Sequence, residues 1–227
     1  MAREFDRNMF IMLLAIMIGA IVITFFVADI INRSKIETLN IKHTEEMETM
    51  AGKNLNFTNH FMKSSVLLDA SREDRAYGDY HFDLAFLFYN TALSEENSSI
   101  IESYQARTID NCTNAMEKYL ISHENFVSAK GFFNDTKTYT SYEKYLEILD
   151  LYIGLTGSGA KLTMLRYNAS KYLKYMAENL TKIGGLTNIS ELMDMFNQTM
   201  DLYEQESGEY DDCKEKIDEY EFFDEIR

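Results

Sequence analysis

Residues 9–31 read MFIMLLAIMIGAIVITFFVADII, and the only charged side chain in this stretch is Asp29. A helix needs about 20 apolar residues to cross the hydrocarbon core of a bilayer. A soluble helix usually keeps one polar face, which this stretch lacks. We therefore predict an uncleaved transmembrane signal-anchor helix over residues 9–31. The alternatives are a buried core helix and a cleaved signal peptide, whose apolar core is usually only about 7 to 15 residues long.

Flanking charges do not decide the orientation of this span, because Arg3 and Arg7 precede it while Arg33 and Lys35 follow it. The asparagines are more informative. Nine of the sixteen asparagines begin an Asn-X-Ser/Thr triplet, which is about four times the number expected by chance. Oligosaccharide is transferred to this triplet only outside the cytoplasm. We therefore expect a protein of the plasma membrane in which residues 1–8 are cytoplasmic and residues 32–227 are extracellular.

The triplet at Asn32 begins too close to the predicted bilayer surface to be modified. Eight N-glycosylation sites are therefore predicted: Asn56, Asn97, Asn111, Asn134, Asn168, Asn179, Asn188 and Asn197. The alternative interpretation is a polar chain that happens to be rich in Asn, Ser and Thr.

The composition beyond the span favours helices. The chain has no proline and only ten glycines, whereas sheet proteins need both residues at many turns. We predict an all-α fold, with a helical stalk over residues 32–53 followed by an antiparallel helical bundle over residues 54–227. Breaks between seven helices are expected at Gly52, near residues 73–75, 95–97 and 131–140, at residues 154–159, and at residues 184–187. The segment 76–94 is apolar almost all round, which is typical of a helix inside a bundle or against a partner.

Two helical segments carry apolar seams, and each seam contains a cysteine. The first seam includes Thr108, Cys112 and Tyr119, and the second is a near-heptad series that includes Cys213 and Ile217. In an oxidising compartment we expect Cys112 and Cys213 to form a disulfide. The alternative is that both are small buried hydrophobic residues. The second seam runs through an acidic segment, for which the alternative is a frayed tail after Gly208.

No catalytic, cofactor-binding or metal site is predicted. The histidines His43, His60, His81 and His123 share no metal-ligand spacing. The run GLTGSGAKLT at residues 154–163 resembles a phosphate-binding loop, but Lys161 comes one residue too late, so we expect a helix–helix turn. Residues 69–93 resemble half of a tetratricopeptide repeat, but no copy follows about 34 residues later.

The formal charge of −15 argues against nucleic acid as a partner, because a phosphate backbone binds clustered Lys and Arg. Taken together, these patterns predict a single-pass membrane glycoprotein with a structural or protein-interaction role, for example as an accessory subunit of a cell-envelope or membrane complex. Its expected partners are other membrane or envelope proteins. One alternative is an extracellular helical-bundle sensor that signals through a partner, since residues 1–8 are too short for a signalling module. An enzyme is the third alternative, and no residue pattern supports it.

Overall fold

The computed structural model describes the backbone of residues 2–180 and 185–220, and the side chains of residues 31–180 and 189–220. All regular structure in these residues is helical, in four helices: α1 (Ala2–Ser94), α2 (Ser98–Lys137), α3 (Glu143–Asn179) and α4 (Gly185–Asp218). The predicted all-α class is confirmed. The chain divides into two compact units, residues 1–53 and residues 54–227.

The first unit consists of the beginning of α1. From residue 31 to residue 53 the side chains are exposed, including those of Ile36, Leu39 and Met47. Within the part of the chain that is described, no helix has a stretch that is long and apolar enough to cross a membrane. The side chains of the predicted span, as far as residue 30, lie outside that part.

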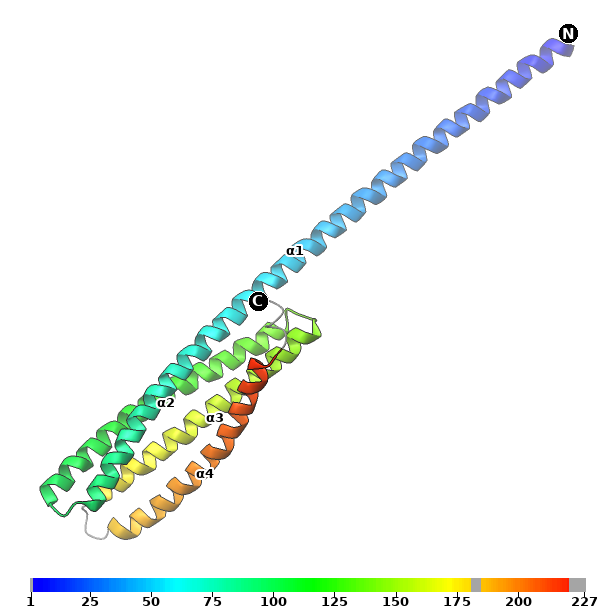
Figure 1. Cartoon of the computed structure of the whole chain (residues 1–227). Helices are drawn as coiled ribbons and strands as arrows, with labels where there is room; N and C mark the ends of the chain where they lie inside the picture. The colour runs from blue at the N-terminus through cyan, green and yellow to red at the C-terminus, as the bar shows by residue number, and fades with distance from the viewer. Residues whose placement is uncertain (1, 181–184, 221–227) are drawn as a thin grey trace. The chain divides into compact units, whose positions relative to one another are not determined.

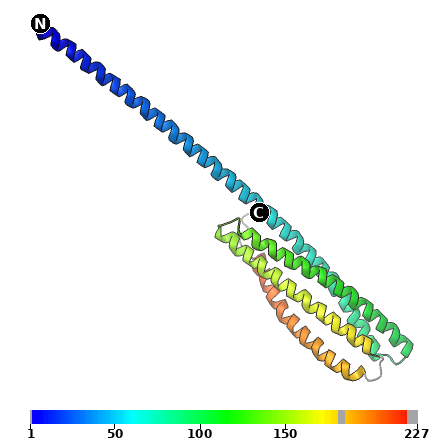
Figure 2. The same cartoon turned by 180° about the vertical axis from the view of Figure 1, so that it is seen from behind.

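The second unit is a four-helix bundle in which consecutive helices run in opposite directions (Figure 1, Figure 2). Contacts between α1 and α2 show this directly. Ser122 donates a hydrogen bond to the carbonyl of Ser71 at 2.7 Å, whereas Asn111, earlier in α2, contacts His81, later in α1. The same reversal relates α2 to α3 and α3 to α4. The ring closes where Arg72 of α1 donates to the hydroxyl of Tyr210 of α4 at 3.2 Å.

Four helices are present where seven were predicted, because several glycines lie inside helices instead of ending them. Gly52 lies inside α1, Gly131 inside α2, and Gly154 and Gly159 inside α3. A β carbon built on Gly159 would lie 2.4 Å from Cε1 of Phe126. This glycine therefore lets two helices approach closely. The prediction of a helix–helix turn at residues 154–163 was wrong, as were those of breaks at Gly52 and near residue 74.

Two hydrophobic clusters form the core of the bundle. The first, around Phe126, Phe133 and Leu149, joins residues of all four helices. The second lies around Tyr89, Cys112 and Leu173. Four members of the predicted seam are fully buried, as the three-and-four spacing indicated: Thr108, Cys112, Ala115 and Tyr119. Ile101 and Tyr104, which begin this seam, are half-buried.

The acidic end of α4 packs on the bundle. Tyr210 and Ile217 are each only 7% exposed. The hydroxyl of Tyr220 donates to Oε2 of Glu147 at 2.7 Å. The packing predicted from the apolar seam is therefore confirmed, and the alternative of a frayed tail is wrong as far as Asp218.

Candidate functional site

A layer of polar side chains separates the two hydrophobic clusters. We call it the polar layer, and it takes residues from all four helices: Arg75, Asp79, Tyr119, Arg166 and Tyr203. Asp79 lies at its centre. Its Oδ1 accepts a hydrogen bond from the hydroxyl of Tyr119 at 2.7 Å and lies 3.5 Å from Nε of Arg166. Its Oδ2 lies 3.7 Å from Nε of Arg75. One carboxylate therefore faces two guanidinium groups.

The surroundings of Arg166 are suited to a buried cation. Its side chain is 14% exposed, and its guanidinium carbon lies 4.5 Å from the ring centre of Phe82 and 4.2 Å from that of Tyr203. Two aromatic faces and one carboxylate thus replace most of its water. Burial, reinforced by the negative charge of Asp79, raises the pKa of Tyr119, so this phenol stays protonated as a donor. A ligand bound between the helices at this level would have to displace these side chains.

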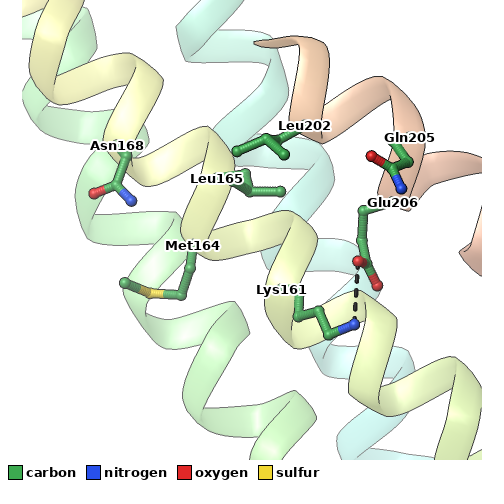
Figure 3. A pocket seen from close by; sticks show the side chains of 7 residues that line it. All are labelled: Lys161, Met164, Leu165, Asn168, Leu202, Gln205 and Glu206. Atoms are coloured by element: carbon green, nitrogen blue, oxygen red, sulfur yellow. Dashed lines mark hydrogen bonds and ion pairs between the residues drawn. The ribbon is translucent and has the colours of Figure 1, made fainter. Parts of the chain in front are cut away.

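An open groove of about 390 Å³ lies between α3 and α4 (Figure 3). Its lining is Lys161, Met164, Leu165 and Asn168 from α3 with Leu202, Gln205 and Glu206 from α4. Nζ of Lys161 lies 3.2 Å from Oε2 of Glu206, whereas Oε1 of Glu206 is buried and has no hydrogen-bond partner among the described residues. Small-molecule sites usually enclose most of their ligand. This groove is open, which suits a protein surface better.

The predicted glycosylation sites differ in exposure. Asn56, Asn97, Asn134 and Asn197 have exposed side chains, whereas Asn111, Asn168 and Asn179 are half-buried and Asn188 lies outside the described side chains. Asn97 also caps α2, because its Oδ1 accepts from the backbone nitrogen of Ser99 at 3.0 Å. Asn168 lines the α3–α4 groove, so a glycan there would fill it. Sequence spacing alone could not separate these two classes.

The predicted disulfide is absent, and this prediction was wrong. Cys112 and Cys213 are both free. Cys112 is buried in the cluster around Tyr89, whereas Cys213 packs against the cluster around Phe126. Both residues lie on core seams, as predicted, but the polar layer stands between their clusters. The position of a residue in a seam predicts which face of its helix the residue lies on. It does not predict how far along the bundle axis the residue lies.

The two thiols should react very differently with an alkylating reagent. Burial raises the pKa of Cys112 to about 12, which leaves almost no thiolate at neutral pH. Cys213 is half-buried and borders an open groove between α3 and α4. We expect iodoacetamide to modify Cys213 alone in the folded chain and both residues in urea, as measured by peptide mass spectrometry. Equal modification of Cys112 in the folded chain, or a disulfide-linked peptide, would contradict the structure.

A third groove, of about 550 Å³, lies on the outer face of α1 and is lined by Glu73, Ala76, Tyr77, Tyr80 and His81. Tyr77 is 52% exposed and Tyr80 is 59% exposed. The apolar residues all round segment 76–94 predicted that this helix is covered, but they could not show which side fills the bundle core and which side stays exposed. Nothing in the sequence predicted the polar layer, because charged residues in a helix usually face solvent.

No group of three or more His, Cys, Asp or Glu side chains in the described residues is placed to hold a metal ion. Two histidines of the bundle have hydrogen-bond partners: Nδ1 of His81 lies 3.0 Å from Oδ1 of Asn111, and that of His123 lies 3.0 Å from the carbonyl of Ala160. Nδ1 of His60 lies 3.9 Å from Oδ2 of Asp135. Comparison of the chain with protein-family models, with curated proteins and with solved structures gives no significant match.

Proposed function

We propose that this chain is a single-pass membrane glycoprotein whose extracytoplasmic four-helix bundle docks other proteins. The apolar stretch at residues 9–31 is the basis for the anchor, because it is long enough to span a bilayer and carries a single charge at its far end. The observation that carries the docking role is the outer face of α1. Here a groove on a helix surface is bordered by the exposed rings of Tyr77 and Tyr80.

The interior of the bundle favours docking over the sensing of a small molecule. The level at which a ligand would sit between four helices is occupied by Arg166, Asp79 and Tyr119, which bind one another. The α3–α4 groove, of about 390 Å³, lies open on the surface. A small-molecule site usually encloses most of its ligand, which neither of these positions does.

The four exposed triplet asparagines are the proposed glycan carriers: Asn56, Asn97, Asn134 and Asn197. Their side chains are exposed, whereas those of Asn111, Asn168 and Asn179 are half-buried. On α1, no triplet begins between Asn56 and the end of the helix at Ser94. The outer face of this helix is therefore the surface that the proposed function leaves open to a protein partner.

The orientation is tested by glycan removal and by protease protection. We expect the full chain to fractionate with membranes and to lose apparent mass after deglycosylation. Protease added to intact cells should remove the bundle. Changing the four exposed asparagines to Gln should reproduce the mass loss, whereas Asn114→Gln, outside any triplet, should have no effect. An unmodified chain that is protected from external protease would overturn the proposed topology.

A further inference from the structure

We propose that the outer face of α1 is the interface of a parallel homodimer, in which the groove at Tyr77 receives Tyr77 of a second copy. The occupant is thus a second copy of this chain. The parallel direction rests on the proposed membrane anchoring, because two copies anchored in one bilayer present α1 in the same direction.

The outer side of α1 follows heptad spacing from Val66 onward. Alternating steps of four and three residues connect Val66, Ala70, Glu73, Tyr77, Tyr80, Leu84 and Leu87, of which Ala70 and Leu84 are half-buried and the others exposed. Leu55, Asn59 and Met62 precede them with the same steps, but the two successive steps of four at Met62, Val66 and Ala70 shift the register by one residue. Most of the apolar members are more than half exposed, for example Met62 at 61%, Val66 at 67% and Leu87 at 57%. The opposite side of the same helix contributes Leu68, Phe82 and Tyr89 to the core. The helix therefore has two apolar faces, and the bundle covers one of them.

The groove has the geometry of a coiled-coil hole. Glu73, Ala76, Tyr77 and Tyr80 stand at positions i, i+3, i+4 and i+7, and such a diamond of four residues receives one side chain of a facing helix. In the register of the series from Val66 to Leu87, with heptad positions named a to g, Tyr77 is an a position. Glu73 is then the preceding d position, Ala76 the preceding g position and Tyr80 the next d position. In a parallel, in-register pair, an a residue inserts between these four positions. The side chain that fits this hole is therefore Tyr77 of the second copy.

The area is sufficient for a dimer. A large apolar side chain has a solvent-accessible area of about 200 Å² when fully exposed. The six most exposed apolar residues of the series therefore each have roughly 100 Å² of accessible area in the single chain. Two copies would then bury about 1,200 Å², the lower end of a standard interface.

Cysteine cross-linking of the full chain in native membranes tests the interface. In a Cys213→Ser background, Tyr77→Cys should give a covalent dimer on mild oxidation, since like residues face each other. Tyr175→Cys is the matched control, because Tyr175 is an exposed tyrosine on α3, across the bundle from α1. We expect no dimer band from this control. Equal cross-linking at both positions, or none at Tyr77, would overturn the interface.

Analytical ultracentrifugation in detergent gives the second measurement. Tyr77→Glu with Tyr80→Glu should raise the dissociation constant of the dimer at least about 30-fold, as expected for the loss of interface hot spots. Glu73→Leu should lower it, because in the dimer Glu73 faces its own copy. A wild-type chain that stays monomeric, or a dimer that none of these changes affects, would refute the proposal. Membrane fractionation of the same variants tests the anchor separately, so failure of either inference can be recognised.

Discussion

Replacing Asp79 with leucine is expected to destabilise the folded bundle by about 3 kcal/mol, because the guanidinium of Arg166 would remain buried without its counter-charge. Arg166 is 14% exposed and cannot turn to solvent without leaving the rings of Phe82 and Tyr203. The hydroxyl of Tyr119, which is fully buried, would also lose its acceptor. The expected cost stays below the upper range for buried pairs because the Asp79 side chain is 30% exposed and is already partly hydrated.

Two further variants separate charge from packing. Asp79→Asn keeps an acceptor for Tyr119 and should cost less than leucine. The double variant Asp79→Leu, Arg166→Met removes both charges and should recover most of the lost stability, since an apolar pair of similar volume often replaces a buried ion pair at little cost. Urea unfolding of the full chain in detergent, followed by circular dichroism, measures these three variants and the single variant Arg166→Met. If the effects of Asp79→Leu and Arg166→Met simply add in the double variant, the ion pair does not couple α1 to α3.

Much of the fold could be predicted because helix periodicity is a local property. The absence of proline, the seam from Thr108 to Tyr119 and the acidic α4 with its apolar face all gave correct predictions. The helix ends were harder to predict because the same residue type has two uses. Glycine favours the end of a helix through its backbone freedom, but it also fits where two helices approach closely. Only the neighbour across the interface, such as Phe126 at Gly159, distinguishes these uses.

The candidate sites were harder to predict because they depend on residues far apart in the sequence. Nothing near Asp79 in the sequence indicates that Arg166 will face it, and nothing near Cys112 indicates that Cys213 lies against the other cluster. The face of α1 was a partial exception. The excess of apolar residues all round segment 76–94 predicted a helix inside a bundle or against a partner, and the structure shows which of its apolar residues the bundle leaves exposed.

The same substitution, glycine to alanine, should have opposite effects at two helical positions. Gly131 lies in α2, and a β carbon added there would meet no other side chain or helix within 4 Å. Gly131→Ala should therefore stabilise the chain by about 1 kcal/mol through helix propensity. At Gly159 the new methyl would stand 2.4 Å from Cε1 and 2.6 Å from Cζ of Phe126. Phe126 is fully buried within its cluster, so its ring cannot move into solvent without leaving the core.

Overpacking by the new methyl group in Gly159→Ala costs about 1 to 3 kcal/mol, and more where the two backbones must separate. This cost outweighs the gain of about 1 kcal/mol in helix propensity. We therefore expect net destabilisation by about 2 kcal/mol, measured by the same urea titration. Phe126→Leu in the Gly159→Ala background should recover part of this loss, because a smaller side chain makes room for the methyl group. The two alanine variants would then differ by about 3 kcal/mol although the substitution is identical. Stabilisation at both positions would mean that α2 and α3 are not in close contact at Gly159.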